Sequence, residues 1–395
     1  GPAPAQLRAL VAPHVESFDW LLRAGLEEVV AGLEPVAVAP GAAGGGELRM
    51  WLDGVEVGRP REARGAGTVA LETPRDCREG ARTYRAPLSA KLCFQCGPDG
   101  PLREEECPLG LLPIMVQSLG CNLRGLSQRE LLARREDAHE LGGYFVSNGN
   151  ERLVRLLIVQ RRHFPVALVR PSFAKRGTGF TEYGSLMRCC RPDQTAVVMK
   201  LHYLDTGDVQ VGFAAKKREY FLPAGVILRC LSDLSERETF EALVGAAEDD
   251  AFPFYADRAE IILRSAAGKG LRSQEAALAH LGGHFREVIG APESCSDAEA
   301  GELVLDRYFF VHLSEAHEKR DVLVFMIQKL LALVAGRTRS DNVDSSAQHE
   351  LLLPGQLIAH IVRDTLENYL GGLRDFIRSR VAREPELVDL GDPQV

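Results

Sequence analysis

Two hydrophobic periods organise the first third of the chain. Apolar side chains recur every three or four positions in residues 17–33, which predicts an amphipathic helix with Ser17 or Asp19 available as its cap. Residues 47–58 alternate instead, and Asp53-Gly54 between their two halves predicts a tight hairpin. Further strand-like and helical runs predict an α+β fold for this part. These are strands at 83–94 and 111–118, followed by a helix at 127–141.

The middle of the chain begins with strands and ends with helices. Asp205 to Asp208 separate two alternating runs within residues 196–214, which predicts a second hairpin. Helical patterns follow at 236–247, 255–267, 273–289 and 320–335. The polar, turn-rich residues 338–350 then mark a boundary between units. We therefore expect a second α+β unit before that boundary.

A long amphipathic helix is predicted to open near Pro354. Its apolar stripe consists of Leu357, Ile358, Ile361, Leu366, Tyr369, Leu373, Phe376 and Ile377. The final dozen residues offer this stripe no partner surface, so we expect it to pack back on the first domain. The expected organisation is a first domain at 1–165, an inserted domain at 166–340 and a returning segment at 341–395.

Composition supports two domains of ordinary size. The chain has 395 residues, of which 45% are hydrophobic and 26% are charged. Its nine cysteines are irregularly spaced, and the longest apolar run, 321–336, is interrupted by Gln328 and Lys329. We expect an intracellular, reduced protein with no membrane-spanning helix. The chain begins with Gly1-Pro2 instead of Met, which is typical of residues left after tag cleavage, so we expect a fragment.

Charge is distributed unevenly along the chain. The formal net charge of −8 argues against a globally basic nucleic-acid binder. Residues 151–219 nevertheless contain thirteen Lys or Arg against six Asp or Glu, whereas residues 233–260 contain two against nine. These are either two solvated surfaces, or one face toward a polyanion and another toward a basic partner.

Motifs that would carry catalysis or metal binding are incomplete. Cys93 and Cys96 form a C-x-x-C, but Cys107 and Cys121 follow at poor spacing, so a structural zinc is a weak alternative. His280 and His284 stand four apart, although the intervening residues lack the Glu of a metalloprotease motif.

Residues 263–270 fail the pattern of a phosphate-binding loop, and residues 65–70 fail that of a dinucleotide fingerprint. The acidic run 248–250 lacks the alternation of a cation site. An architectural or binding role is therefore favoured over an enzyme.

Residues 142–151, GGYFVSNGNE, combine a double glycine, two aromatic residues and an Asn-Gly turn before a basic run. This order is similar to the protrusion signature of the second-largest subunit of multisubunit RNA polymerases. The continuation, with RPSF, KRGTGFTEYG and MRC, resembles the RNA polymerase I version. Similar stretches are APHVESFDWLLRAGLEEV, LPIMVQSLGCNL, EYFLPAGVILRCLS and DNVDSSAQHELLLPGQL.

The resemblance covers nearly the whole chain and implies a fold and a role. It implies a protrusion at 1–165, an inserted lobe at 166–340 and the start of the returning protrusion at 341–395, which together form one side of the DNA cleft. Implied partners are the largest RNA polymerase I subunit, an initiation-factor-like heterodimer and a small zinc-ribbon cleavage subunit on the lobe, and DNA. The implied setting is ribosomal RNA synthesis in the nucleus, at the nucleolus.

The resemblance also implies that no catalytic residue or cofactor lies in this fragment, because the family's magnesium is held by aspartates of the largest subunit. The fragment alone is therefore expected to be inactive. The alternative is a free-standing interaction scaffold derived from the same fold, with a structural zinc at Cys93 and Cys96.

A basic surface is the candidate nucleic-acid site. Arg161, Arg162 and His163 are expected to stay solvated before Pro165, close to Lys175 and Arg176 in a Gly-flanked loop. The candidate contacts are Arg161, Arg162, Lys175, Arg176 and Arg188. Contacts of this type bind phosphates and position a nucleic acid without reading its sequence. The same arginines could instead pair with acidic residues of neighbouring subunits.

Overall fold

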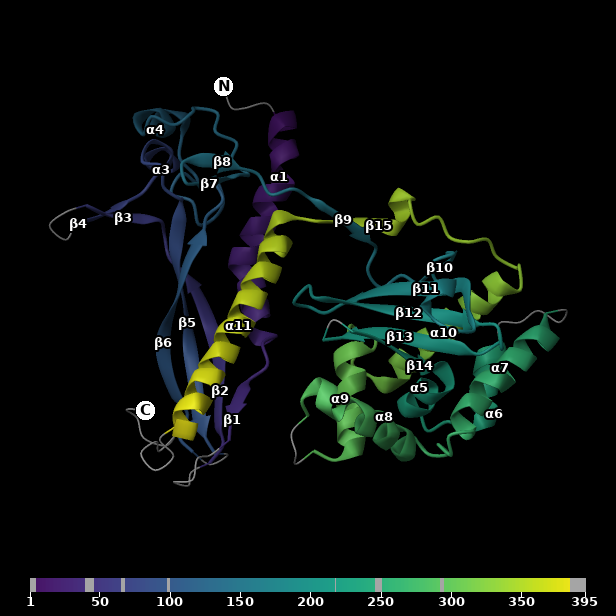
Figure 1. The fold of residues 1–395 in the computed structure, drawn as a ribbon. Helices are drawn as coiled ribbons and strands as arrows, with labels where there is room; N and C mark the ends of the chain where they lie inside the picture. Colours follow the sequence, from purple (N-terminus) through teal and green to yellow (C-terminus); the bar gives the residue numbers. More distant parts are fainter. Residues whose placement is uncertain are drawn as a thin grey trace. The chain divides into compact units, whose positions relative to one another are not determined.

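The computed structural model describes residues 5–39, 46–64, 68–97, 100–216, 218–245, 251–291 and 295–383 (Figure 1). The acidic run 248–250 lies outside these ranges. The chain forms two compact units: unit 1 comprises 1–157 and 351–395, and unit 2 comprises 158–350. Among the described residues, no helix combines the length and the apolarity needed to cross a membrane.

Unit 1 is built on a four-stranded antiparallel sheet. Its order is β1 (Val36–Val38), β2 (Leu48–Val57), β5 (Arg85–Cys96) and β6 (Arg103–Pro113). The hairpin predicted at Asp53-Gly54 is wrong, because β2 runs through both residues and pairs with β5 on either side of them. Gly54 has a φ of 54° and sits at a shift in register, so the dipeptide forms a bulge.

The helices of unit 1 pack on that sheet. The predicted N-terminal helix begins earlier than expected, as α1 (Ala5–Trp20), and continues through a π-helical turn (Leu21–Gly25) into α2 (Leu26–Ala31). Ser17 and Asp19 therefore lie inside the helix and do not cap it. Gly355, at the start of α11 (Pro354–Arg383), crosses α1 so closely that a Cβ there would meet the Ser17 carbonyl oxygen at 1.9 Å.

The apolar stripe predicted for α11 is correct in part. Leu366 is buried in the unit 1 core together with Ala359 and Leu370, against residues of α1 and α2. Ile361 and Phe376 are 65% and 61% exposed, because they lie on the opposite side of the helix.

Short elements complete unit 1. They are β3 (Arg61–Arg64), β4 (Thr68–Leu71), α3 (Pro74–Glu79), α4 (Gln128–Ala133), β7 (Phe145–Ser147) and β8 (Asn150–Arg152). Gly142 and Gly143 have φ values of 73° and 85°, and a Cβ on Gly143 would meet Val11 Cγ1 at 2.5 Å. The double glycine therefore permits the close approach predicted from the sequence.

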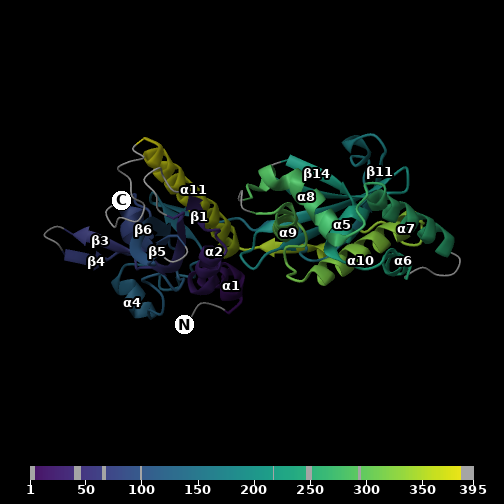
Figure 2. The same cartoon turned by 90° about the horizontal axis from the view of Figure 1, so that it is seen from below.

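Unit 2 pairs a five-stranded antiparallel sheet with helices. The sheet order is β10 (Val166–Val169), β11 (Phe180–Cys190), β12 (Ala196–Leu204), β13 (Val209–Ala215) and β14 (Arg218–Pro223). The hairpin predicted at Asp205 to Asp208 is confirmed as the β12–β13 connection. The helices, seen from a second direction in Figure 2, are α5 (Ala224–Leu231), α6 (Glu236–Val244), α7 (Phe252–Ala267), α8 (Gln274–Ile289), α9 (Asp297–Tyr308) and α10 (Ala316–Val334).

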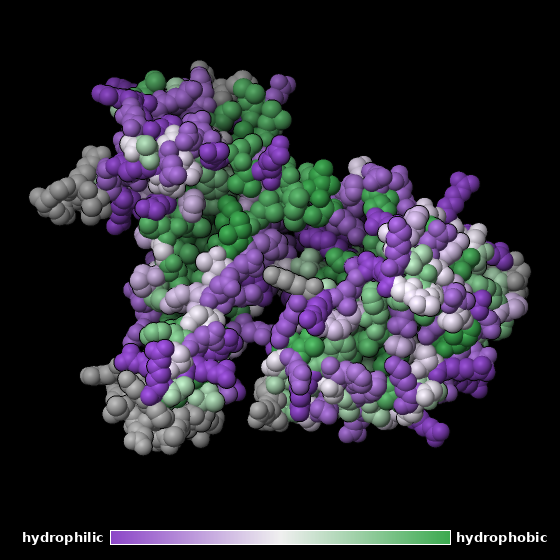
Figure 3. Space-filling view, in the orientation of Figure 1, coloured by the Kyte–Doolittle hydropathy of each residue, from purple (hydrophilic) through white to green (hydrophobic). Residues whose placement is uncertain are grey.

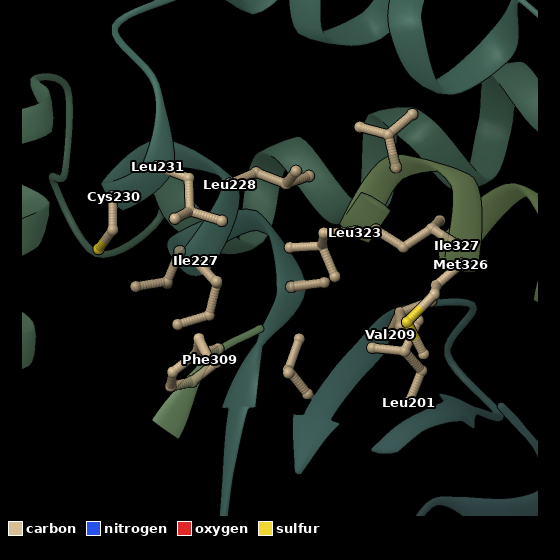
Figure 4. Close-up of a cluster of buried hydrophobic side chains, with 14 of the residues drawn as sticks. Leu201, Val209, Ile227, Leu228, Cys230, Leu231, Phe309, Leu323, Met326 and Ile327 are labelled. Atoms are coloured by element: carbon tan, nitrogen blue, oxygen red, sulfur yellow. The ribbon is translucent and has the colours of Figure 1, made fainter. Parts of the chain in front are cut away.

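Helices α5 and α10 bury one face of this sheet. Leu201 and Val209 from the strands meet Ile227 of α5 and Met326 of α10 in the hydrophobic core (Figure 4). Side chains alternate across a strand, so His202 and Arg188 lie on the other face of the sheet. That second face carries the candidate site.

The chain passes between the units in two segments, β9 (Leu157–Gln160) and β15 (His349–Leu352), which pair as a two-stranded sheet. The expected boundaries, after 165 and after 340, fall inside unit 2. Backbone hydrogen bonds explain this placement: His163 N–H donates to the Arg188 carbonyl at 2.7 Å, and Asp341 N–H donates to the Ala167 carbonyl at 2.8 Å. Both flanking segments are thereby tied to the strands of unit 2.

Candidate nucleic-acid interface

All five candidate residues lie in unit 2, but the structure places them in two different environments. Arg162 and Arg188 converge on one carboxylate, that of Glu350. Arg162 Nε donates to Glu350 Oε2 at 2.9 Å, and Arg188 Nη1 donates to Glu350 Oε1. The expectation that Arg162 stays solvated is therefore wrong, since an acidic residue from β15 pairs with it.

Further bonds fix this arginine pair in place. Arg162 Nη1 donates to Gln194 Oε1 at 3.0 Å, and Arg188 Nη1 donates to the Gln160 carbonyl at 3.4 Å. Arg188 is only 8% exposed. Burial alone would raise the pKa of Glu350, but its hydrogen bonds to both arginines outweigh that effect and lower the pKa. The carboxylate therefore stays ionised, and the group holds β15 against β11.

The second environment is the loop before β11, which contains a 3-10 turn (Ala174–Arg176). Phe173 anchors this loop: it is buried, and a Cβ on Gly184 of β11 would meet its ring at 2.6 Å. Arg176 pairs with Glu219, and its guanidinium also lies 5.9 Å from the ring centroids of Phe173 and Phe221. Arg176 therefore serves the loop's own structure.

His202 lies beneath the loop in an aromatic cage. Its ring is edge-on to Phe173 at 4.8 Å and also touches the rings of Phe180 and Phe221. The ring is fully buried, and neither nitrogen has a hydrogen-bond partner among the described residues. Burial first, and then the Arg176 charge, lower the pKa of His202 to about 4. The cage is therefore built around a neutral imidazole.

Lys175 and Arg161 are the candidates that remain open to solvent. Both are exposed, and neither makes an ion pair with a residue that the structure describes. Arg161 lies over the Phe164 ring, 5.3 Å from its centroid, while its backbone N–H donates to the Gln348 carbonyl at 2.7 Å. Lys175 in the loop and Arg161 after β9 are thus exposed cations suited to phosphate contact.

Sequence reasoning missed Glu350, Glu219 and His202. Glu350 is 188 positions from Arg162, and nothing in the local pattern links the two residues. The one available signal was the alternation of β12, which assigns His202 to the face opposite Leu201. From the sequence alone, a polar residue on that face is expected to be exposed to solvent. His202 is buried because the loop that contains Phe173 covers it.

The cysteines predicted as weak zinc candidates do not face each other. Cys93 and Cys96 are three positions apart in β5, so their side chains point to opposite faces of the sheet. Cys93 is buried, whereas Cys96 Sγ lies 3.3 Å from the Gly46 carbonyl oxygen. Cys107 Sγ contacts the Tyr369 hydroxyl at 3.2 Å. In the described parts of the chain, no three His, Cys, Asp or Glu side chains gather as a metal site.

Comparison with known proteins places this fold in a family. Residues 9–390 match the family model described as RNA polymerase beta subunit. A Schizosaccharomyces pombe protein named "Probable DNA-directed RNA polymerase I subunit RPA2" is 38% identical, over 99% of this chain and 34% of its own length. The DNA-directed RNA polymerase I subunit RPA2 of Neurospora crassa is also 38% identical, over 94% of this chain and 32% of its own length.

The same subunit of Mus musculus is 34% identical, over 96% of this chain and 33% of its own length. The chain thus spans about a third of the length of the curated relatives it matches. These similarities confirm the resemblance to the second-largest subunit of RNA polymerase I that the sequence motifs indicated. The chain belongs to the RNA polymerase beta-subunit family.

Proposed function

We propose that this chain is part of the second-largest subunit of RNA polymerase I and acts in the transcription of ribosomal RNA genes. The observation that carries the proposal is the family match over residues 9–390, joined to relatives whose names specify RNA polymerase I. In this role the protein works in the nucleus, at the nucleolus.

Unit 1 corresponds to the protrusion and unit 2 to the lobe in this proposal. The interrupted course of unit 1, which comprises 1–157 and 351–395, supports the assignment, because the family's lobe is an insertion into its protrusion. Together the units form one side of the DNA cleft. Unit 2 docks an initiation-factor-like heterodimer and a small zinc-ribbon cleavage subunit, and the chain assembles with the largest subunit.

The chain contributes architecture and positioning to the reaction. The magnesium of the family's catalytic centre is held by aspartates of the largest subunit, so this part alone has no catalytic residue and needs no cofactor of its own. Its role toward nucleic acid is electrostatic. Lys175 and Arg161 supply the phosphate contacts, while Arg162, Arg188 and Arg176 hold the backbone that presents them.

Affinity purification from nuclear extract tests the assembly. The tagged full-length protein is expected to copurify with the largest RNA polymerase I subunit and with the lobe-bound heterodimer, identified by mass spectrometry. Recovery of neither, from a folded and soluble protein, would reject the proposal in favour of a free-standing scaffold. Zinc analysis of the same sample then tests that scaffold directly, since it predicts a stoichiometric metal at Cys93 and Cys96.

A further inference from the structure

Unit 1 contains a groove that the proposed polymerase role does not use. It encloses about 640 Å³ between one face of α1 and the segments 124–131 and 138–141. The wall from α1 is a single helical stripe: Arg8, Val11, Ala12, Val15, Glu16 and Asp19. Leu126, Leu131 and Leu141 line the other side. Apolar surface is also visible over the first turns of α1, where Leu7 is 46% exposed (Figure 3).

Most polar groups along this groove already have partners within unit 1. Asp19 accepts from the Leu119 backbone N–H at 2.7 Å and pairs with Arg124. Gln128 lies within hydrogen-bond distance of His139. Glu140 accepts from the Tyr144 hydroxyl and from the Gly142 backbone N–H. These groups shape the groove, whose exposed lining is polar and apolar in nearly equal parts.

Arg8 and Glu16 are different. Both side chains are exposed, and neither makes a hydrogen bond or ion pair with any residue in the described ranges. They belong to one stripe of α1 and are separated by eight residues, which corresponds to about 12 Å along a helix axis. Among the described residues that line it, the groove therefore has Arg8 as an unpaired cation and Glu16 as an unpaired anion at a fixed separation.

This spacing distinguishes among classes of ligand. The two opposite charges are about two helical turns apart. A compact metabolite is too short to contact both charges, whereas side chains two turns apart on a second helix have the same spacing. The α1 wall offers side chains but no unpaired strand edge, so an extended peptide would find no backbone ladder there. A cavity of this size accepts the apolar anchors of an amphipathic helix.

We infer that this groove docks an amphipathic helix of a partner chain, with apolar anchors in the groove, a carboxylate opposite Arg8 and a basic group opposite Glu16. The inference concerns unit 1 alone and stands independently of the polymerase assembly. The partner is defined by this charge pair and its spacing. Its apolar residues fall at i, i+4, i+7 and i+11, in line with the stripe they meet.

Three designed peptides test the inference on the full 395-residue chain. Each is a fluorescein-labelled 18-residue helix with leucines at the four anchor positions and two charged residues eight positions apart. The charged pair is Glu/Lys, Glu/Glu or Lys/Lys, so the comparison does not depend on the direction in which the helix lies. By fluorescence anisotropy, the Glu/Lys peptide is expected to bind about fivefold more tightly than the other two.

Single charge reversals should change that preference in a defined way. Arg8→Glu gives the α1 wall two unpaired anions and should make the Lys/Lys peptide the tightest ligand. Glu16→Lys gives it two unpaired cations and should select the Glu/Glu peptide. Ala12→Glu places a charge between the apolar residues Val11 and Val15 of the α1 wall and should weaken all three. Arg152→Glu and Glu56→Lys are matched reversals of exposed residues of unit 1 outside the groove, and they should leave the order of affinities unchanged.

Several outcomes would overturn the inference. Equal affinity for the three peptides, no binding at all, or preferences that ignore Arg8→Glu and Glu16→Lys would each reject it. Sedimentation velocity tests one more alternative. If the chain forms a dimer and Ala12→Glu dissociates it, the groove binds a second copy of the chain and not a partner helix. Circular dichroism confirms that each variant remains helical, so that lost binding reports the surface.

Discussion

Arg188 and Lys175 are both basic residues of unit 2, yet they occupy opposite environments. Arg188 is 8% exposed and shares the Glu350 carboxylate with Arg162, whereas Lys175 is exposed and has no ion-pair partner among the described residues. The basic residues of this one sequence segment therefore have two different roles. Its buried members hold strands together, and its exposed members are available to a polyanion. Local charge counts cannot separate these two functions.

The largest expected effect comes from removing the shared carboxylate. Glu350→Gln leaves two guanidinium groups side by side, one of them buried, and should destabilise unit 2 by about 3 kcal/mol. Both tryptophans, Trp20 and Trp51, lie in unit 1, so fluorescence would not report this loss. Hydrogen exchange with mass spectrometry should show faster exchange in β11 and β12.

Glu182→Gln is the matched control, because Glu182 lies on the same strand as Arg188 with an exposed side chain. It should change the free energy of unfolding by less than about 0.5 kcal/mol. Equal protection in the Glu350→Gln and Glu182→Gln proteins would remove the distinction between buried and exposed charge on which the comparison rests.

A fall in pH should test the same difference between buried and exposed side chains, because His202 is buried. Its pKa is lowered to about 4 in the folded chain, against an ordinary value of 6.5, so the unfolded state binds more protons between these values. Unit 2 is therefore most stable above about pH 6.5 and loses stability as the pH falls toward 4. At pH 5 this one group lowers the free energy of unfolding of unit 2 by about 2 kcal/mol relative to its value above pH 6.5.

His202→Leu should reduce that loss, as measured by hydrogen exchange of unit 2 at pH 7 and pH 5. Part of the loss should persist, because burial also lowers the pKa of His312 in the same unit to about 4. The charged groups that influence the His202 pKa are Arg176, Lys200 and Glu219. They are present in the parent chain and in the His202→Leu variant, so they do not cause a difference between the two. His317→Leu, at an exposed position on α10, is the control and should retain the full pH dependence. An unchanged slope in His202→Leu would mean that another group causes the acid sensitivity.

The elements with strong local signals were the predictable part of the fold. The β12–β13 hairpin and α11 follow from a turn sequence and from helical periodicity. Asp53-Gly54 failed because the same dipeptide suits a bulge, and only pairing with β5 decides between the two. At the candidate site, the basic residues were visible in the sequence, but Glu350 and Glu219 became their partners only through tertiary contacts.

The smallest effect belongs to the exposed cation. Lys175→Glu should weaken DNA retention by the assembled polymerase about twofold to fivefold and reduce the salt dependence of binding by about one unit of slope, as for one lost phosphate contact. Arg176→Glu should do more, because it also sets a second carboxylate against Glu219 and loosens the loop that carries Lys175. Nitrocellulose filter binding across a salt titration measures both variants.

Hydrogen exchange separates the two causes: Lys175→Glu should leave protection of residues 170–180 unchanged, and Arg176→Glu should lower it. Arg237→Glu, on the exposed surface of α6, is the control for total charge and should retain DNA like the parent enzyme. If Lys175→Glu retains DNA equally well at every salt concentration, this loop does not contact phosphate. Its anchoring by Phe173 and Arg176 would then serve a protein partner.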